Sequence, residues 1–172
     1  TEAQVGKQVR AVASYTDGHG TQESRTSAAT AAVANANDAP TGGVTITGTV
    51  AQNQILSAAN TLADADGLGS IAYQWQSSVD GTTWSAIAGA TASTFARTEA
   101  QVSGQVSAVA SYIDGHGTVE SVGSGATTAV ANVNDAQAGG VTITGTATQN
   151  QILSAANTLA DADGLGSIAY QW

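Results

Sequence analysis

The stretch QVSAVASYI, residues 105–113, alternates its side chains in steps of two over nine residues. In an extended chain, successive side chains point to opposite faces, so Val106, Ala108, Ala110 and Tyr112 fall on one face. The turn sequence DGHG follows directly at residues 114–117. The stretch therefore predicts a β-strand that buries one face and ends in a tight turn.

The same period of two recurs in both directions along the chain. VTITGTV (44–50) sets Val44, Ile46 and Val50 against threonines, and IAYQWQ (71–76) places Ile71, Tyr73 and Trp75 on one face. No segment keeps a helical period. The predicted strands are Val44–Val50, Gln54–Leu62, Ile71–Ser77, Trp84–Ile87, Thr94–Arg97, Gln105–Ile113 and Val119–Ala131. The pattern predicts an all-β protein.

The chain repeats itself at a distance of 97 residues. When residues 1–75 are aligned with residues 98–172, 61 of the 75 pairs are identical. This period exceeds the ~20–50 residues of solenoid repeats and approaches the ~100 residues of an immunoglobulin-type sandwich. We therefore expect tandem immunoglobulin-like Greek-key β-sandwiches. Trp75 takes the strand position at which such domains bury a tryptophan, and the expected core residues are Tyr73, Trp75, Tyr112 and Trp172.

Two similar linkers divide the chain. NANDAPTGG (35–43) contains the single proline, Pro40, and NVNDAQAGG (132–140) is its second copy. These linkers predict the second half of one repeat at 1–39, a complete repeat at 40–136 and the first half of another at 137–172. A half-sandwich exposes an apolar face and open strand edges. Either the chain is a section of a longer polymer, or the half-repeats of different chains complete each other.

Charge and composition exclude several classes of partner. The chain is 10% charged and carries a net charge of −9, which argues against binding nucleic acid or anionic lipid, because both require a basic surface. Cysteine is absent, so there is no disulfide and no thiolate metal site. No apolar run reaches the ~18 residues of a membrane span, so direct membrane insertion is not expected.

The acidic residues gather where repeats would meet. TLADADGLGS occurs at 61–70 and again at 158–167, and each copy has two aspartates beside a glycine turn. In an immunoglobulin-like topology, this loop, the DGHG loop and the entering linker lie at one end, opposite TEAQV of the preceding repeat. We expect two clusters, one of Glu2, Asp38, Asp64, Asp66 and Asp114, and one of Glu99, Asp135, Asp161 and Asp163. With no lysine or arginine nearby, a hard cation such as calcium would offset their repulsion.

The linkers VANANDAP and VANVNDAQ resemble the calcium-binding linkers of cadherins, DADG resembles their aspartate motifs, and the glutamate of TEAQV lies where cadherins carry a basal glutamate ligand. The whole repeat resembles the cadherin-like or bacterial immunoglobulin-like repeats of large RTX-type surface adhesins. This resemblance adds Asn35 and Asn37 to the first ligand set, and Asn132 and Asn134 to the second. Asn35 and Asn132 replace the first linker aspartate of cadherins, Gln137 replaces Pro40, and no RTX nonapeptide is present.

The resemblance implies a stalk segment of an extracellular bacterial adhesin or matrix protein, exported by type I secretion to the cell surface. Calcium would stiffen its junctions, and its partners would be neighbouring repeats of the same polymer. Two alternatives remain open. The chain could self-assemble into filaments through half-repeats or sheet edges, or it could bind carbohydrate or protein through Trp84 and the loops.

Catalysis is not expected. The chain has no nucleophile elbow, zinc-protease motif or phosphate loop. Its two histidines, His19 and His116, occupy equivalent DGHG turns, where we interpret them as solvated turn residues. The alternative is that each is a metal ligand or a glycan contact.

Overall fold

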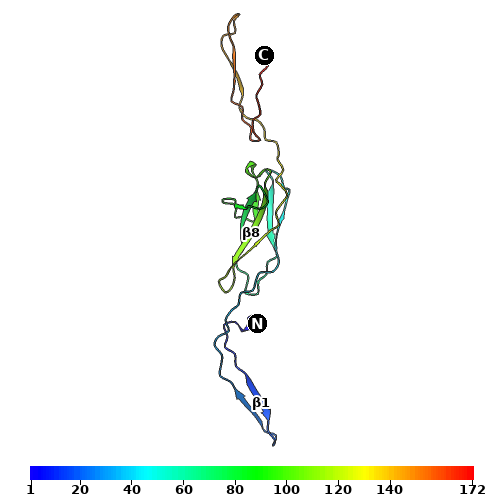
Figure 1. Ribbon diagram of the computed structural model, residues 1–172, viewed down its shortest axis with the longest axis vertical. Helices are drawn as coiled ribbons and strands as arrows, with labels where there is room; N and C mark the ends of the chain where they lie inside the picture. Colours follow the sequence, from blue (N-terminus) through cyan, green and yellow to red (C-terminus); the bar gives the residue numbers. More distant parts are fainter.

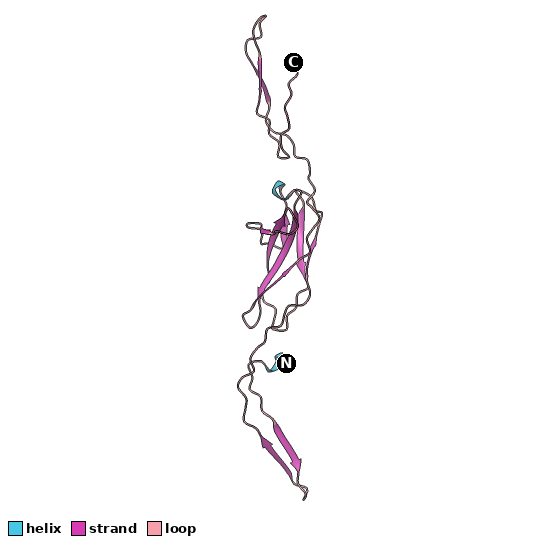
Figure 2. Ribbon diagram, viewed as in Figure 1, coloured by secondary structure: helices cyan, strands magenta, loops and turns pink.

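The computed structural model describes residues 1–172, and the protein is all-β apart from two short 3-10 turns (Figure 2). It forms a long, narrow body with three parts in line (Figure 1). A hairpin lies at each end and a larger sheet structure lies between them. The strands are β1 (Val12–Thr16), β2 (Gln22–Thr26), β3 (Val44–Thr47), β4 (Ile55–Asn60), β5 (Ala72–Ser78), β6 (Ser85–Ala86), β7 (Thr94–Ala96), β8 (Gln105–Ile113), β9 (Val119–Gly123), β10 (Val141–Thr144) and β11 (Ser154–Asn157).

The central part consists of two antiparallel sheets. One has the order β3-β4-β7 and the other the order β6-β5-β8-β9. β5 and β8 form the longest ladder, which runs from Ala72↔Ser111 to Ser78↔Gln105. Isolated parallel bridges at Val44↔Ser124 and Ala51↔Ala131 join the first sheet to the segment after β9. This arrangement is consistent with a β-sandwich.

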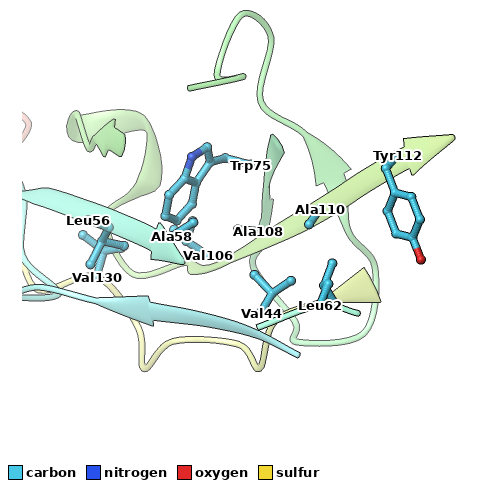
Figure 3. Close-up of a cluster of buried hydrophobic side chains, with 10 residues drawn as sticks. All are labelled: Val44, Leu56, Ala58, Leu62, Trp75, Val106, Ala108, Ala110, Tyr112 and Val130. Carbon is cyan, nitrogen blue, oxygen red and sulfur yellow. The ribbon is translucent and has the colours of Figure 1, made fainter. Parts of the chain in front are cut away.

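The hydrophobic core lies between these two sheets (Figure 3). Trp75 of β5 is completely buried, its indole N–H donates to the Ala92 carbonyl over 2.9 Å, and its ring centroid lies 5.5 Å from that of Phe95. The buried residues are Val44, Leu56, Ala58, Leu62, Trp75, Val106, Ala108, Ala110, Tyr112 and Val130. Four of them are the residues that the alternation of 105–113 assigns to one face, so this prediction is confirmed.

The predicted strand Val119–Ala131 is too long, because β9 ends at Gly123. Beyond it, the amides of Ser124, Thr127 and Val130 donate to the carbonyls of Ala108, Val106 and Gly104. Regular antiparallel pairing uses every second residue, whereas these bonds use every third. The segment therefore still runs beside β8, but as irregular backbone.

The end segments reproduce single hairpins of the central part. β10 pairs with β11 from Val141↔Asn157 to Thr144↔Ser154, the same register that β3 and β4 have 97 residues earlier. Trp172 is 72% exposed, so the expectation that it is a core residue does not hold within this chain. Its counterpart Trp75 lies in β5 beside β8 and packs its ring against Phe95 of β7, whereas the segment 137–172 contains only the strands β10 and β11. Tyr73 is half-buried against the core.

No helix in the structure is long enough and apolar enough to cross a membrane.

Candidate metal centre

The repeated aspartate turn is held by its own first carboxylate. Asp64 Oδ1 accepts the backbone N–H of Asp66 over 2.9 Å, which is the local bond that lets aspartate stabilise a tight turn. Asp64 Oδ2 accepts the hydroxyl of Tyr112 on β8. Both Asp64 oxygens are thus engaged within the central part, and the turn directs the next carboxylate, that of Asp66, towards the end segment.

Asp66 has a buried carboxylate of which only one oxygen is satisfied. The residue is 5% exposed, and its Oδ2 accepts the backbone N–H of Asp38 in the linker over 2.7 Å. Its Oδ1 is buried and has no hydrogen-bond partner. A buried charge without a partner is costly, so this atom is a candidate metal ligand.

The DGHG turn after β8 covers Asp66. Asp114 Oδ1 accepts the N–H groups of His116 and Thr118, each over 2.8 Å, while Asp114 Oδ2 is buried and unpartnered. Burial alone would raise the pKa of the Asp114 carboxyl, but donation from these two amides outweighs it and the pKa is lowered. A Cβ on Gly115 would lie 2.5 Å from the Asp66 carbonyl oxygen, so only glycine allows this approach.

His116 lies against the end segment that contains Glu2. Its Nε2 is 3.0 Å from Glu2 Oε1 and 4.0 Å from Asp66 Oδ1. The hydrogen bond to Glu2 raises the pKa of the imidazole above its ordinary value, although burial opposes this. His116 is exposed in its turn, but its ring also contacts Glu2, so the alternative that it is a metal ligand stays a prediction.

The linker asparagines take two different positions. Asn35 Oδ1 is buried and unpartnered, and Asn35 lines a shallow pocket with Glu2 and Asp38. Asn37 instead donates from Nδ2 to Glu120 Oε1 over 2.7 Å. Asp38 contributes its backbone N–H and is exposed. The first junction is the place where the linker 35–43 meets the loops after β4 and β8. Three buried oxygens lack partners there: Asn35 Oδ1, Asp66 Oδ1 and Asp114 Oδ2.

The second junction repeats the linker geometry. The N–H of Asp135 donates to Asp163 Oδ2 over 2.8 Å, and the N–H of Asp163 donates to Asp161 Oδ1 over 3.0 Å. Glu99 at the start of η2 (Glu99–Gln101) brings its carboxylate within 4.8 Å of those of Asp135 and Asp163. Asp163 is exposed here. Of the linker asparagines, Asn134 donates to the Asp135 carbonyl, and Asn132 is exposed.

Gln52 is a junction residue that the sequence did not indicate. It is 2% exposed, its Nε2 donates to Asp135 Oδ2 over 2.7 Å, and its Oε1 accepts the N–H of Val133 over 3.1 Å. Both partners lie more than 80 residues along the chain. Gln52 therefore joins the central part to the second linker.

No lysine or arginine offsets these carboxylates. Every ion pair of 4.0 Å or less in the structure involves His116, and the buried guanidinium of Arg97 donates to the carbonyls of Thr49 and Ala51. Carboxylate and amide oxygens are the ligands that calcium prefers, and it accepts six to eight of them in flexible geometry. The donor set of the first junction therefore fits a hard divalent cation.

Trp84 lies apart from both junctions. It is half-buried and lines a shallow hollow with Gln76, Ser107 and Val109, over the outer side of the β5–β8 ladder. The possible ligand contact at Trp84 stays a prediction.

Neither a curated protein nor a solved structure matches the chain. Residues 45–130, which run from β3 to the segment beyond β9, match the model of a family described as "Domain of unknown function (DUF8696)". This match covers half of the chain and nearly all of the central part. The protein therefore belongs to the DUF8696 family.

Proposed function

We propose that the chain is an extender segment of a large extracellular bacterial adhesin or matrix protein, in which calcium stiffens the junctions between immunoglobulin-like repeats. The sheet order β3-β4-β7 against β6-β5-β8-β9 supports the immunoglobulin-like Greek-key arrangement of the central part. The in-line arrangement of three parts supports a rod (Figure 1).

One observation carries the calcium proposal: three buried oxygens at the first junction have no hydrogen-bond partner. Asn35 comes from the linker, Asp66 from the loop after β4, and Asp114 from the loop after β8. Cations bound at this junction would compensate these buried oxygens and would tie the linker to the loops of the central part. Calcium would thus fix the angle between the segments.

Calcium titration of the whole chain tests the proposal. We expect calcium to raise the unfolding temperature and to lengthen the maximum dimension measured by small-angle X-ray scattering, and a chelator to reverse both. Asp114→Asn should remove most of the calcium effect. Asp17→Asn is the matched control, because Asp17 accepts the N–H groups of His19 and Thr21 in the same way but lies in the exposed turn of the first hairpin. Unchanged stability and length on chelation would exclude the proposal.

A second candidate function is self-association between copies of the chain. In the first segment, Val9 and Tyr15 are 43% and 57% exposed, although their counterparts Val106 and Tyr112 are buried. In the last segment, Ile143 and Trp172 are likewise exposed. The first segment carries the counterparts of β8 and β9, and the last segment carries those of β3 and β4, which lie in the other sheet of the central part. The apolar faces of the first segment of one copy and the last segment of another would therefore cover each other. Sedimentation velocity over a concentration series tests this, and a monomer at all concentrations would exclude it.

A further inference from the structure

The first junction contains an imidazole nitrogen in addition to the oxygens that are proposed to bind calcium. Glu2 Oε1, Asp66 Oδ1 and His116 Nε2 all lie within 4.8 Å of one another. Glu2 belongs to the first segment, and the other two belong to different loops of the central part. The Asp66 side chain is fully buried, and its unpartnered Oδ1 is the atom that faces the imidazole.

Imidazole nitrogen discriminates between classes of cation. Calcium and magnesium bind oxygen, whereas zinc and related first-row ions bind imidazole together with carboxylates. The cluster of Glu2, Asp66 and His116 combines imidazole nitrogen with carboxylate oxygen, so its donor set favours an ion of the zinc class.

We propose that Glu2, Asp66 and His116 form a binding site for a transition divalent cation of the zinc class, which joins the first segment to the central part. The structural role of this site rests on the proposed stalk function, because the ion would hold two segments of the stalk together. Asp66 belongs both to the proposed calcium ligands and to this site. Its ligand chemistry does not depend on calcium.

The distances and the charge suit such an ion. Zinc lies about 2.0–2.2 Å from nitrogen and oxygen ligands, so two ligands of a tetrahedral site are about 3.4 Å apart. The distances of 3.0 Å and 4.0 Å from His116 Nε2 to the two carboxylates lie on either side of that value. Glu2 and His116 are partly exposed and can adjust, while the Asp38 amide holds Asp66 in place. Two carboxylates and a neutral imidazole balance the charge of the ion.

The chain contains its own control in His19. This residue occupies the same DGHG sequence in the first hairpin, where it is exposed and its ring makes no hydrogen bond or ion pair. With only two histidines in the chain, long-range ¹H–¹⁵N spectra of the imidazoles resolve both rings. His116→Asn removes the proposed nitrogen ligand, and His19→Asn removes only the exposed ring.

Zinc titration of the untagged, metal-free whole chain, followed by calorimetry and by these spectra, tests the proposal. We expect the Nε2 signal of His116 to shift and that of His19 to stay in place. His116→Asn and Glu2→Gln should each weaken zinc binding by more than about 10-fold, the lower bound for losing even a supporting partner of a metal ligand. His19→Asn should leave it unchanged.

Zinc binding that is absent, unaffected by His116→Asn, or equally reduced by His19→Asn would overturn the proposal. A circular dichroism spectrum of the His116→Asn protein that matches that of the unchanged chain shows that the variant is folded. If calcium stabilises the chain and zinc does not bind, this proposal fails and the calcium stalk stands. If zinc binds through His116 and calcium has no effect, the calcium proposal fails instead.

Discussion

The backbone N–H of Asp38 donates to Oδ2 of Asp66 over 2.7 Å, and this bond leaves the second oxygen of the carboxylate buried and unpartnered. At the next junction, Asp135 and Asp163 form the same bond over 2.8 Å, yet Asp163 is exposed. The local sequence sets the bond in both places. The loop after β8 covers only the first, so burial depends on tertiary packing.

Trp75 and Trp172 occupy equivalent positions in the repeat, but Trp75 is buried and Trp172 is exposed. Substitution of the two residues should therefore change the free energy of unfolding by different amounts. Trp75→Ala should lower the free energy of unfolding by about 3–5 kcal/mol, because it empties the centre of the core. Trp172→Ala should change it by less than about 0.5 kcal/mol. Chemical denaturation followed by circular dichroism measures both. Equal effects of the two substitutions would contradict the core described here.

Gly69 and Gly166 form a second matched pair. A Cβ on Gly69 would lie 2.0 Å from the Ile113 carbonyl oxygen, whereas a Cβ on Gly166 meets nothing within 4 Å. Gly69→Ala should therefore destabilise the chain by about 1–3 kcal/mol through overpacking, and Gly166→Ala should have little effect. Thermal unfolding of the two variants checks this, and a neutral Gly69→Ala would refute the close approach of the loop to β8.

Gln52 should control the order of the second linker. Gln52→Ala leaves the Val133 N–H without its partner and releases Asp135, a loss of about 1–3 kcal/mol for the local structure. Amide hydrogen exchange should then speed up at Val133 and much less in β8. Gln149→Ala is the control, because Gln149 is the exposed counterpart of Gln52. Unchanged exchange at Val133 would show that Gln52 does not hold the linker.

The buried phenol of Tyr112 should make the folded chain less stable at alkaline pH. Burial, reinforced by the hydrogen bond to Asp64, raises the pKa of the Tyr112 phenol above its ordinary value. A raised pKa in the folded state means that this contribution to stability is complete below about pH 10, the unfolded value, and declines as the pH rises further. Unfolding midpoints measured from pH 8 to 11 should fall, and Tyr112→Phe should flatten the decline. An unaltered slope in Tyr112→Phe would contradict this.

Alternation along the strand allowed β8 to be predicted to the residue. The same reasoning overextended β9, because the chain beyond Gly123 still follows β8 but pairs irregularly at every third residue. Side-chain periodicity detects the face that a segment buries. It does not detect whether each amide finds a partner in a regular ladder.

The candidate site could be predicted only in outline. Asp38, Asp66 and Asp114 could be assigned to one junction because loop order in a sandwich determines which turns share an end. The proximity of His116 to Glu2 depends on how the turn after Asp114 directs its side chains, and sequence spacing does not fix that direction. Gln52 gives no local signal, because its partners Val133 and Asp135 are 81 and 83 residues away.

The chain enters the central part at one end of the long axis and leaves at the other (Figure 1). Its entering strand β3 and the segment that leaves beyond β9 lie side by side in parallel, bridged at Val44↔Ser124 and Ala51↔Ala131. A pull on the two ends would slide these segments past each other, so the bridges would bear the load together instead of opening one after another. The fold is thus arranged to resist tension along its length.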